Sequence, residues 1–307
     1  MSTSRETSEP HSAQYIEDAN RNFYWNRDQI QLVADRLGLQ TATTMLDVGC
    51  GVGHWTFLLA SVLRPDVQVT GVDRETEWIQ SATERAAQMD LGHRFQFREG
   101  DVMALEFPDA TFDLVTCQTV LMHLADPQPA IRELLRVTKP GGVVLCAEPN
   151  SLSAFVMLSS TNASAPVDDV LDLVRFGLTC ERGKAAVGEG NDSIGNLLPG
   201  YLAAAGCVEV QSCACDKTHA LYPPYTSEEQ QALRGYYLGG FEGMLWPRER
   251  AKRYFLAGGG SEAEFDASWA RREAECERDA QAIREERFHI LGSWVLYLIA
   301  ARKPADA

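Results

Sequence analysis

A glycine-rich turn that follows an acid is the clearest chemical signal in this chain. Asp47 ends an apolar run, and Gly49, Gly51 and Gly53 follow at alternate positions. Glycine allows a positive φ angle and lets a ligand lie against bare backbone. In the dinucleotide-binding pattern G-x-G-x-x-G, the third glycine comes one position later and no acid is needed in front. A carboxylate before the turn disfavours a pyrophosphate and suits a ligand that carries positive charge.

Two further acids follow predicted strands. Asp73 ends the apolar run 67–72, about 20 residues beyond the glycine turn, where an acid can accept hydrogen bonds from both hydroxyls of a ribose. Each such bond to a charged acceptor contributes roughly 1.5–3 kcal/mol. Asp101 follows the next strand and can accept the exocyclic amine of adenine, with the Val102 N–H reaching the ring. The three acids together predict S-adenosylmethionine as the cofactor, because its ammonium and sulfonium groups suit Asp47.

Strands and helices alternate regularly as far as Asn150. Strands are predicted at 44–48, 67–72, 94–98, 112–118 and 142–147, with helices at 54–63, 75–89, 119–124 and 127–137. Such alternation predicts a parallel sheet with right-handed crossovers.

Four segments carry a family resemblance: LDVGCGVG, GVD, EGDVMALEFPDATFDLVTCQTVLMHLADP and LLRVTKPGGVVLCAEPN. In this order they resemble the class I S-adenosylmethionine-dependent methyltransferases, most of all the bacterial small-molecule enzymes related to the ubiquinone and menaquinone methylases. The resemblance is close over residues 40–150. It implies an α/β fold, a Rossmann-like doubly wound sheet of seven strands with an antiparallel last strand, and ligands at the carboxyl ends of the strands.

The expected organisation adds a mainly helical cap, formed by two insertions that select the substrate. The parts are a disordered start at 1–14, N-terminal helices covering the cofactor at 15–40, the cofactor-binding core at 41–150, a first cap insertion at 151–192, a core helix and sixth strand at 193–216, a helical cap insertion at 217–288, and the last strand and tail at 289–307. Helices are predicted at 167–176, 193–206, 227–245, 247–255 and 261–287, and strands at 207–215 and 292–300.

Further cofactor contacts are assigned by position. Cys50 lies within the glycine turn, where the backbone can approach a ligand closely. The backbone of Cys117 and Gln118, at the end of the fourth strand, is expected beside the methionine moiety. His54 begins the helix after the turn, either near the cofactor carboxylate or as a helix cap.

For three residues farther from the turn, a contact with the cofactor has a simple structural alternative. Arg74 follows the ribose acid and either covers the adenine edge or is solvated. Tyr15 and Trp25 either close over the cofactor, with a cation–π contact to the sulfonium, or pack on a helix face.

Methyl transfer mainly requires alignment, which can lower the barrier by ~7–11 kcal/mol. A general base is needed only when the nucleophile must lose a proton. His123, just past the fourth strand, is the first candidate base, with packing and loop order as the alternative. Glu148 and Asn150, at the end of the fifth strand, either bind or deprotonate an acceptor or cap the loop.

Composition narrows the partners. The net charge of −15 argues against nucleic acid, which requires a cationic face. No apolar run is long enough for a membrane span, and the polar start is unlike a signal peptide, so a cytoplasmic location with reduced cysteines is expected. No metal site is predicted, because Cys213 and Cys215 lack the partners of a zinc pattern. The charged helix 261–287 leaves a homodimer contact open.

The resulting prediction is an enzyme that moves a methyl group to an O, N or C nucleophile of a small molecule, in bacterial secondary metabolism. The alternative is a relative that binds the cofactor without methylating, as a regulatory subunit or for another reaction. A nicotinamide dehydrogenase is a third reading, which the glycine spacing and Asp47 oppose.

Overall fold

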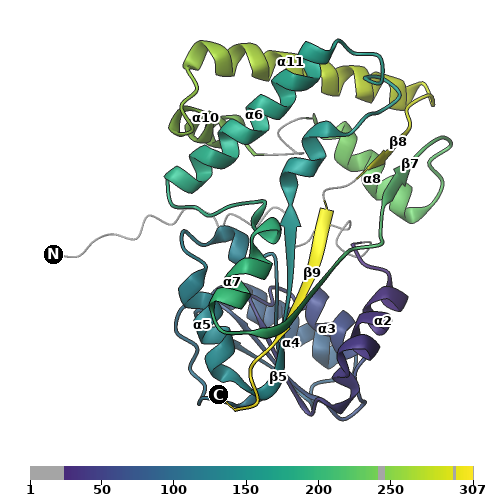
Figure 1. Cartoon of the computed structure of the whole chain (residues 1–307). Coiled ribbons are helices and arrows are strands. Elements are labelled where there is room, and N and C mark those ends of the chain that lie inside the picture. The colour runs from purple at the N-terminus through teal and green to yellow at the C-terminus, as the bar shows by residue number, and fades with distance from the viewer. Residues whose placement is uncertain (1–23, 241–245, 293–294, 307) are drawn as a thin grey trace.

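The structure, a computed structural model, describes residues 24–240, 246–292 and 295–306. Its lower part in Figure 1 is a sheet with helices on both faces, and its upper part is a cap of helices beyond the carboxyl end of the long central strand. None of the described helices combines the length and the apolar character needed to cross a membrane.

The sheet has seven strands in the order β3-β2-β1-β4-β5-β9-β6. They are β1 (Thr44–Val48), β2 (Gln68–Asp73), β3 (Phe95–Glu99), β4 (Phe112–Gln118), β5 (Thr138–Asn150), β6 (Val208–Ala214) and β9 (Val295–Arg302). The first five pair in parallel, whereas β9 is antiparallel to both β5 and β6. The predicted doubly wound sheet with an antiparallel last strand is therefore confirmed. Its strand order reverses between β1 and β4, the kind of switch point at which α/β sheets bind ligands.

Helices cover both faces of the sheet. They are α2 (Arg27–Leu37), α3 (His54–Ala60), α4 (Thr76–Gln88), α5 (Gln128–Val137) and α7 (Leu198–Ala204), with the 3-10 turns η2 (Leu39–Thr41), η3 (Leu121–His123), η4 (Ser151–Val156) and η5 (Ile194–Asn196). Two separate apolar clusters form, one under α2 and α3 and the other under α5 and α7. The sheet is therefore buried on both sides, which explains why its strands read as nearly continuous apolar runs.

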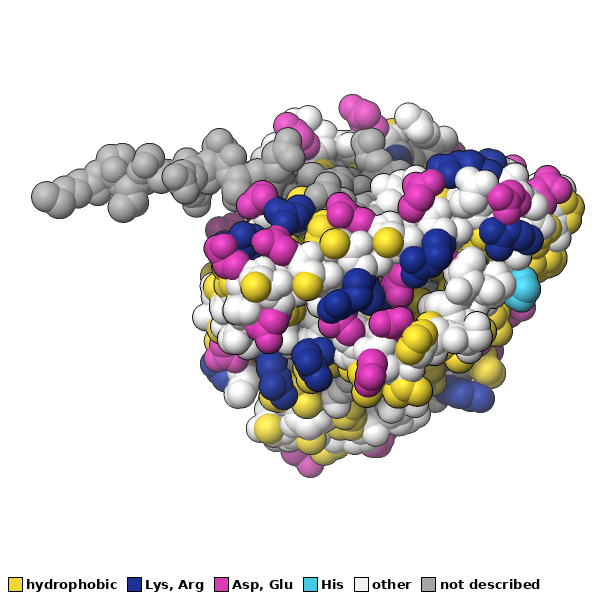
Figure 2. All heavy atoms as spheres, turned by 90° about the horizontal axis from the view of Figure 1, so that it is seen from above, with side chains coloured by type: hydrophobic (Ala, Val, Ile, Leu, Met, Phe, Trp, Pro, Cys, Tyr) yellow, Lys and Arg dark blue, Asp and Glu magenta, His cyan; other side chains and the backbone are white. Residues whose placement is uncertain are grey.

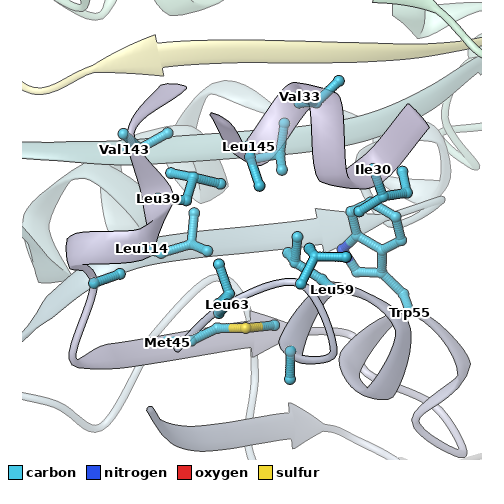
Figure 3. Close-up of a cluster of buried hydrophobic side chains, with 14 of the residues drawn as sticks. Ile30, Val33, Leu39, Met45, Trp55, Leu59, Leu63, Leu114, Val143 and Leu145 are labelled. Atoms are coloured by element: carbon cyan, nitrogen blue, oxygen red, sulfur yellow. The ribbon is translucent and has the colours of Figure 1, made fainter. Parts of the chain in front are cut away.

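The cluster under α2 and α3 fixes the helix that follows the glycine turn. Figure 3 shows Ile30 of α2 beside the Trp55 ring of α3, in the same apolar cluster as Leu114 of β4. Trp55 Nε1 donates a 2.9 Å hydrogen bond to Thr116 Oγ1, which in turn donates to the Leu145 carbonyl at 2.6 Å. Because a buried indole N–H needs a partner, this chain of bonds ties α3 to β4 and β5.

The cap consists of α6 (Val167–Ala186), α8 (Glu228–Leu238), α10 (Arg248–Ala257) and α11 (Glu262–Arg284), with a two-stranded sheet of β7 (His219–Leu221) and β8 (Ile290–Gly292). Ser261 begins α11 with a capping box that includes Glu264. Seen from above, basic and acidic side chains are interspersed over the cap (Figure 2). This face of the molecule therefore has no broad region of positive charge.

The cap has its own apolar core of stacked rings. Phe176 from α6 lies 5.4 Å from Phe255 of α10 and 5.9 Å from Phe265 of α11, between ring centroids. Trp269 stacks on Phe265 at 5.4 Å. These rings bury a large area at low entropy cost, so they account for most of the packing between the three helices.

The remaining cap aromatics separate into buried and exposed rings. Trp246 joins the ring core, Tyr225 belongs to a second small core, and Tyr222 is 55% exposed. Phe241 lies outside the described residues.

Several boundaries differ from the sequence prediction. The helix expected at 167–176 continues to Ala186, and Gly183 in this added part lets the backbone of α10 pack closely against it. The helix expected at 193–206 is split into η5 and α7. The β7–β8 pair was not predicted, since its two strands are three residues each and far apart in sequence. The segment before residue 24 lies outside the described residues, and the seven-part division stays a prediction.

Replacing Gly183 should show how closely α6 and α10 pack. An added Cβ would lie 1.6 Å from the Tyr254 carbonyl oxygen, so the helices must move apart. We expect Gly183→Ala to lower the free energy of unfolding by about 1–3 kcal/mol, measured by urea denaturation. Gly235→Ala is the matched control in an exposed turn of α8, with open space around the new methyl group. It should raise stability by about 0.5–1 kcal/mol; equal effects of the two variants would contradict the close packing.

Candidate active site

Asp47 is a buried carboxylate with one oxygen still to be satisfied. It lies near the end of β1 and is 1% exposed. Thr56 Oγ1 donates a 2.5 Å hydrogen bond to its Oδ2, whereas its Oδ1 is buried without a hydrogen-bond partner among the described residues. Burial raises the pKa of Asp47 to about 7, the bond from Thr56 opposes the rise, and the charge of Asp73 adds to it. A cationic group beside Oδ1 would satisfy this oxygen and favour the carboxylate.

The glycine turn needs its glycines for two physical reasons. Gly49, Gly51 and Gly53 have φ angles of 69°, 52° and 87°, in the left-handed region that other residues rarely adopt. In addition, a Cβ on Gly49 would lie 2.4 Å from a methyl group of Val120. The turn therefore packs directly against the loop that follows β4.

Asp73 connects the turn to the end of β2. Its Oδ2 accepts a 2.9 Å hydrogen bond from the Gly51 N–H, and its Oδ1 accepts from the Glu75 N–H at 3.1 Å. Burial raises the pKa of this carboxyl, and the backbone hydrogen bonds act against the rise. Each oxygen keeps lone-pair capacity for another donor, so the carboxylate is fixed in direction and can still accept from a ligand. Arg74 is mostly exposed and pairs with Glu75 at 3.0 Å, as a solvated arginine would.

Asp101 follows β3 and is exposed. Its Oδ1 accepts a 2.8 Å hydrogen bond from the Met103 N–H, and Val102 beside it is half-buried. The side chain therefore orders its own loop while the residue stays exposed. Asp47 lies near the end of β1, Asp73 ends β2 and Asp101 follows β3, so the structure brings the three acids to the carboxyl ends of three neighbouring parallel strands.

Glu148 organises the loop after β4. It is fully buried near the end of β5, where Oε1 accepts from the N–H groups of Val120 and Leu121, both at 2.9 Å. Oε2 accepts from the Met122 N–H at 3.3 Å. Burial raises the pKa of Glu148 to about 7, while these three bonds and the charge of Lys184 lower it. Both oxygens thus face the loop, which corresponds to the loop-capping alternative considered from the sequence.

The other candidates around this loop differ in their burial. His123 ends η3 and is half-buried, as is Gln118. Cys117 is fully buried, with its Sγ 4.0 Å from Glu148 Oε1. Asn150 Oδ1 is buried without a hydrogen-bond partner among the described residues, so it can accept a hydrogen bond from a ligand.

The remaining predicted contacts lie around the glycine turn. Cys50 is buried within it, and His54 is half-buried at the start of α3. Trp25 packs against Trp55, with ring centroids 5.3 Å apart, so its observed contact is with the core. Tyr15 lies outside the described residues.

Sequence reasoning missed several supporting residues. Thr56 lies nine positions after Asp47, on the helical face that turns back to the strand, and this spacing could have indicated it. Val120 and Lys184 act through tertiary contacts and left no local signal. In the described part of the chain, no group of three or more His, Cys, Asp or Glu side chains is arranged to hold a metal ion.

Comparison with known proteins agrees with this geometry. Residues 39–189 match a family model described as a methyltransferase domain. The demethylmenaquinone methyltransferase of Listeria monocytogenes serotype 4a is 33% identical over 129 residues, 41% of this chain and 52% of the relative. That of Geobacillus stearothermophilus is 33% identical over 135 residues, 44% of this chain and 56% of the relative. The chain thus spans about half the length of the curated relatives it matches.

Solved structures share the fold. The YcgJ protein of Bacillus subtilis aligns over 91% of this chain and 99% of its own, with 19% identity and a TM-score of 0.50. A protein of Bacillus halodurans C-125 described as a methyltransferase aligns over the same shares, with 17% identity and a TM-score of 0.51.

The buried carboxyl of Asp47 should make stability depend on pH. Its pKa in the folded protein, about 7, exceeds the ordinary value of 3.8. Folding therefore favours the protonated form, and the cost of the charge grows as pH rises from about 4 to 7. We expect Asp47→Asn to be more stable than the parent protein by roughly 2–4 kcal/mol at pH 8, with the difference shrinking toward pH 4, in urea denaturation.

Thr56→Val provides the opposite comparison. It removes the hydrogen bond that lowers the pKa of Asp47, so it should lose more stability at pH 8 than at pH 4.5. A stability difference for Asp47→Asn that is the same at both pH values would contradict the buried, charge-destabilised carboxyl.

Proposed function

We propose that this chain is a class I S-adenosylmethionine-dependent methyltransferase, since residues 39–189 match a methyltransferase domain. It would methylate an O, N or C nucleophile of a small molecule by in-line displacement, an activity of class EC 2.1.1.-. The observation that supports this most directly is the buried Oδ1 of Asp47, which lacks a partner among the described residues beside a turn of bare glycine backbone. A ligand with an ammonium group satisfies that oxygen, and a pyrophosphate does not.

The cofactor contacts follow from this assignment. Asp47 binds the ammonium group, and Asp73 accepts the ribose hydroxyls while its Gly51 bond keeps it in place. The turn of Gly49, Cys50, Gly51 and Gly53 passes along the methionine moiety. These residues are supported by their shared edge of the sheet and by the Gly51–Asp73 hydrogen bond.

The outer contacts rest on position alone. Asp101 and the Val102 N–H face the adenine, and the Cys117 and Gln118 backbone lies beside the methyl group. Four further residues contribute at the rim of the cofactor site: His54, Arg74, Tyr15 and Trp25. The described contacts support these four less than they support the acids.

The chemistry demands little beyond alignment. When bound, S-adenosylmethionine supplies the methyl group and a sulfonium leaving group. The acceptor's electron pair would form the new bond to the methyl carbon, and the electrons of the broken C–S bond would pass to sulfur. For an O–H, N–H or C–H acceptor, His123 would take the released proton. Asn150 Oδ1 accepts a hydrogen bond from the acceptor. Glu148 is assigned to loop position and not to proton transfer, because both of its oxygens accept backbone bonds.

The cap would choose the acceptor. Its helices lie beyond the carboxyl ends of the strands (Figure 1), where an acceptor must meet the methyl group. Most of the cap lies after residue 189, where the family match ends. A demethylated quinone, which the relatives' names indicate for them, is therefore only one among the small molecules to be tried. The alternative, cofactor binding without methylation, predicts binding and no methylated product.

Calorimetric titration with S-adenosylhomocysteine should show micromolar binding, and NADH should not bind. Asp73→Asn should weaken binding at least tenfold (about 1.4 kcal/mol), because it removes the charged ribose acceptor. Asp66→Asn, at an exposed residue whose carboxylate pairs with Arg64, is the matched control and should leave binding unchanged. Absence of binding in parent protein shown to be free of co-purified ligand would overturn the assignment.

Binding should also release protons. An ammonium group beside Asp47 lowers the pKa of its carboxyl from about 7, so affinity should rise between pH 6 and pH 8. Repeating the titration in buffers of different ionisation enthalpy measures the protons released. An affinity independent of pH would contradict the role of Asp47.

The proton acceptor can be tested with labelled S-adenosylmethionine and an acceptor found by screening. His123→Ala should lower turnover by about 100-fold and change the affinity for S-adenosylhomocysteine less than twofold. His93→Ala, at an exposed position, is the control. Unchanged turnover would remove His123 as the base, and the lack of any methylated product would favour the non-methylating alternative.

A further inference from the structure

The loop after β4 is bonded from two sides at a single residue, Met122. From the core, Met122 donates its N–H to Glu148 at 3.3 Å. From the cap, its carbonyl oxygen accepts a 2.9 Å bond from the Asn191 N–H and a 3.4 Å bond from Lys184 Nζ. Because η3 is only three residues long, these bonds to Met122 fix the residue immediately before His123.

Lys184 is unusual in its setting. Its side chain is 0% exposed, near the end of α6, and forms an ion pair with the buried Asp192. Next to this pair, the buried Glu181 accepts a 2.7 Å bond from Ser193 Oγ. A lysine is rarely buried unless it is paired, and a plain packing role would be filled by methionine or leucine at no such cost. We therefore infer that the charge of Lys184, and not only its packing, serves a purpose at this position.

The backbone beside Lys184 is shaped to the same loop. Gly190 has a φ of 98°, and a Cβ there would lie 2.1 Å from the Met122 carbonyl oxygen. Two residues earlier, Gly188 also has a positive φ of 78°, but its added Cβ would only reach the Ala125 methyl group at an ordinary 3.8 Å. The cap segment 187–192 thus touches the loop most closely at Met122.

We propose that Lys184 and Asp192 are positioning residues: with Gly190 and Asn191 they form a clamp through which the cap fixes the loop at Met122 and thereby the place of His123. The catalytic meaning of this clamp rests on the proposed methyl transfer. Both the core and the cap are needed to fix the loop. At Met122, Glu148 of the core binds only the N–H, and the carbonyl is bound by the two donors of the cap.

The charge of Lys184 also acts on the core side of the clamp. Burial raises the pKa of both Glu148 and Glu181 to about 7, and Lys184 lowers both. Among the described residues, Cys117 of β4 and Tyr297, the register partner on β9, are titratable neighbours of Glu148, Cys146 of β5 lies beside Cys117, and Asp192 of the cap pairs with Lys184. Without Lys184, the carboxylate of Glu148 should take up a proton at a higher pH. Protonation weakens its acceptance of the three loop N–H groups, which loosens the loop.

Hydrogen–deuterium exchange of the full chain tests the clamp. In Lys184→Met, the amides of 119–124 should exchange at least tenfold faster at pH 7, while peptides from α10 and α11 keep the exchange rates of the parent protein. Corrected for intrinsic exchange, loop protection should fall with decreasing pH, and its midpoint should lie at higher pH in Lys184→Met. Lys252→Met, which removes an α10 lysine paired with Glu262, is the matched control. Uniform loosening of the cap, or an unshifted midpoint, would reduce Lys184 to a structural role and overturn the proposal.

A second pair of variants keeps every charge in place. Gly190→Ala pushes a methyl group against the Met122 carbonyl, whereas Gly188→Ala carries a similar backbone strain without that contact. Faster loop exchange in Gly190→Ala alone supports the clamp even if Lys184→Met fails to fold, and equal exchange in both variants contradicts it. All these measurements use the ligand-free protein. Failure of the parent protein to bind S-adenosylhomocysteine would therefore overturn the proposed function and leave the clamp standing or falling on its own result.

Discussion

Asp47, Asp73 and Glu148 lie at the ends of three parallel strands, and the burial of their carboxyl groups governs the rest of the site. Parallel pairing brings the ends of β1, β2 and β5 to one edge of the sheet, while helices on both faces keep water away from it. In such surroundings a charge is costly unless it is bonded. The Gly51 N–H, the Thr56 hydroxyl and the loop amides reduce this cost, because each donates a hydrogen bond to one of the three carboxylates.

The three carboxylates meet this cost differently. Glu148 accepts three backbone N–H groups, and Asp73 accepts two. Asp47 has only Thr56 for one oxygen, and its other oxygen has no partner in the described part of the chain. A buried carboxylate whose oxygens all accept hydrogen bonds from the protein is typical of a structural role. A buried carboxylate oxygen without such a bond is typical of a ligand site, where stability is given up for binding. This contrast separates Glu148 from Asp47 even though burial raises the pKa of both to about 7.

The sequence predicted those parts of the structure that depend on residues close together along the chain. The glycine turn lies within a few residues of Asp47, each further acid lies at the end of its own strand or just after it, and the strand and helix periods around them were correct. The path of α6 through Gly183 and the pairing of β7 with β8 depend on contacts between segments far apart in sequence. For the same reason Glu148 was considered as a base: its partners, the amides of the loop after β4, lie more than 25 residues earlier.

The end of the family match falls inside the contact between cap and core. Lys184 lies within the matched residues 39–189, whereas Asn191 and Asp192 lie just beyond them. The part of the chain that matches the family model thus meets the rest of the cap at Met122, one residue before the candidate base. Since the Met122 carbonyl is bonded only from the cap side among the described contacts, a cap that shifts to admit a different acceptor must also shift the loop. Under the proposed function, acceptor choice and the alignment of the reacting groups would therefore be coupled through Met122. A cap exchanged for another would then have to reproduce the donors to Met122 as well as a new binding surface.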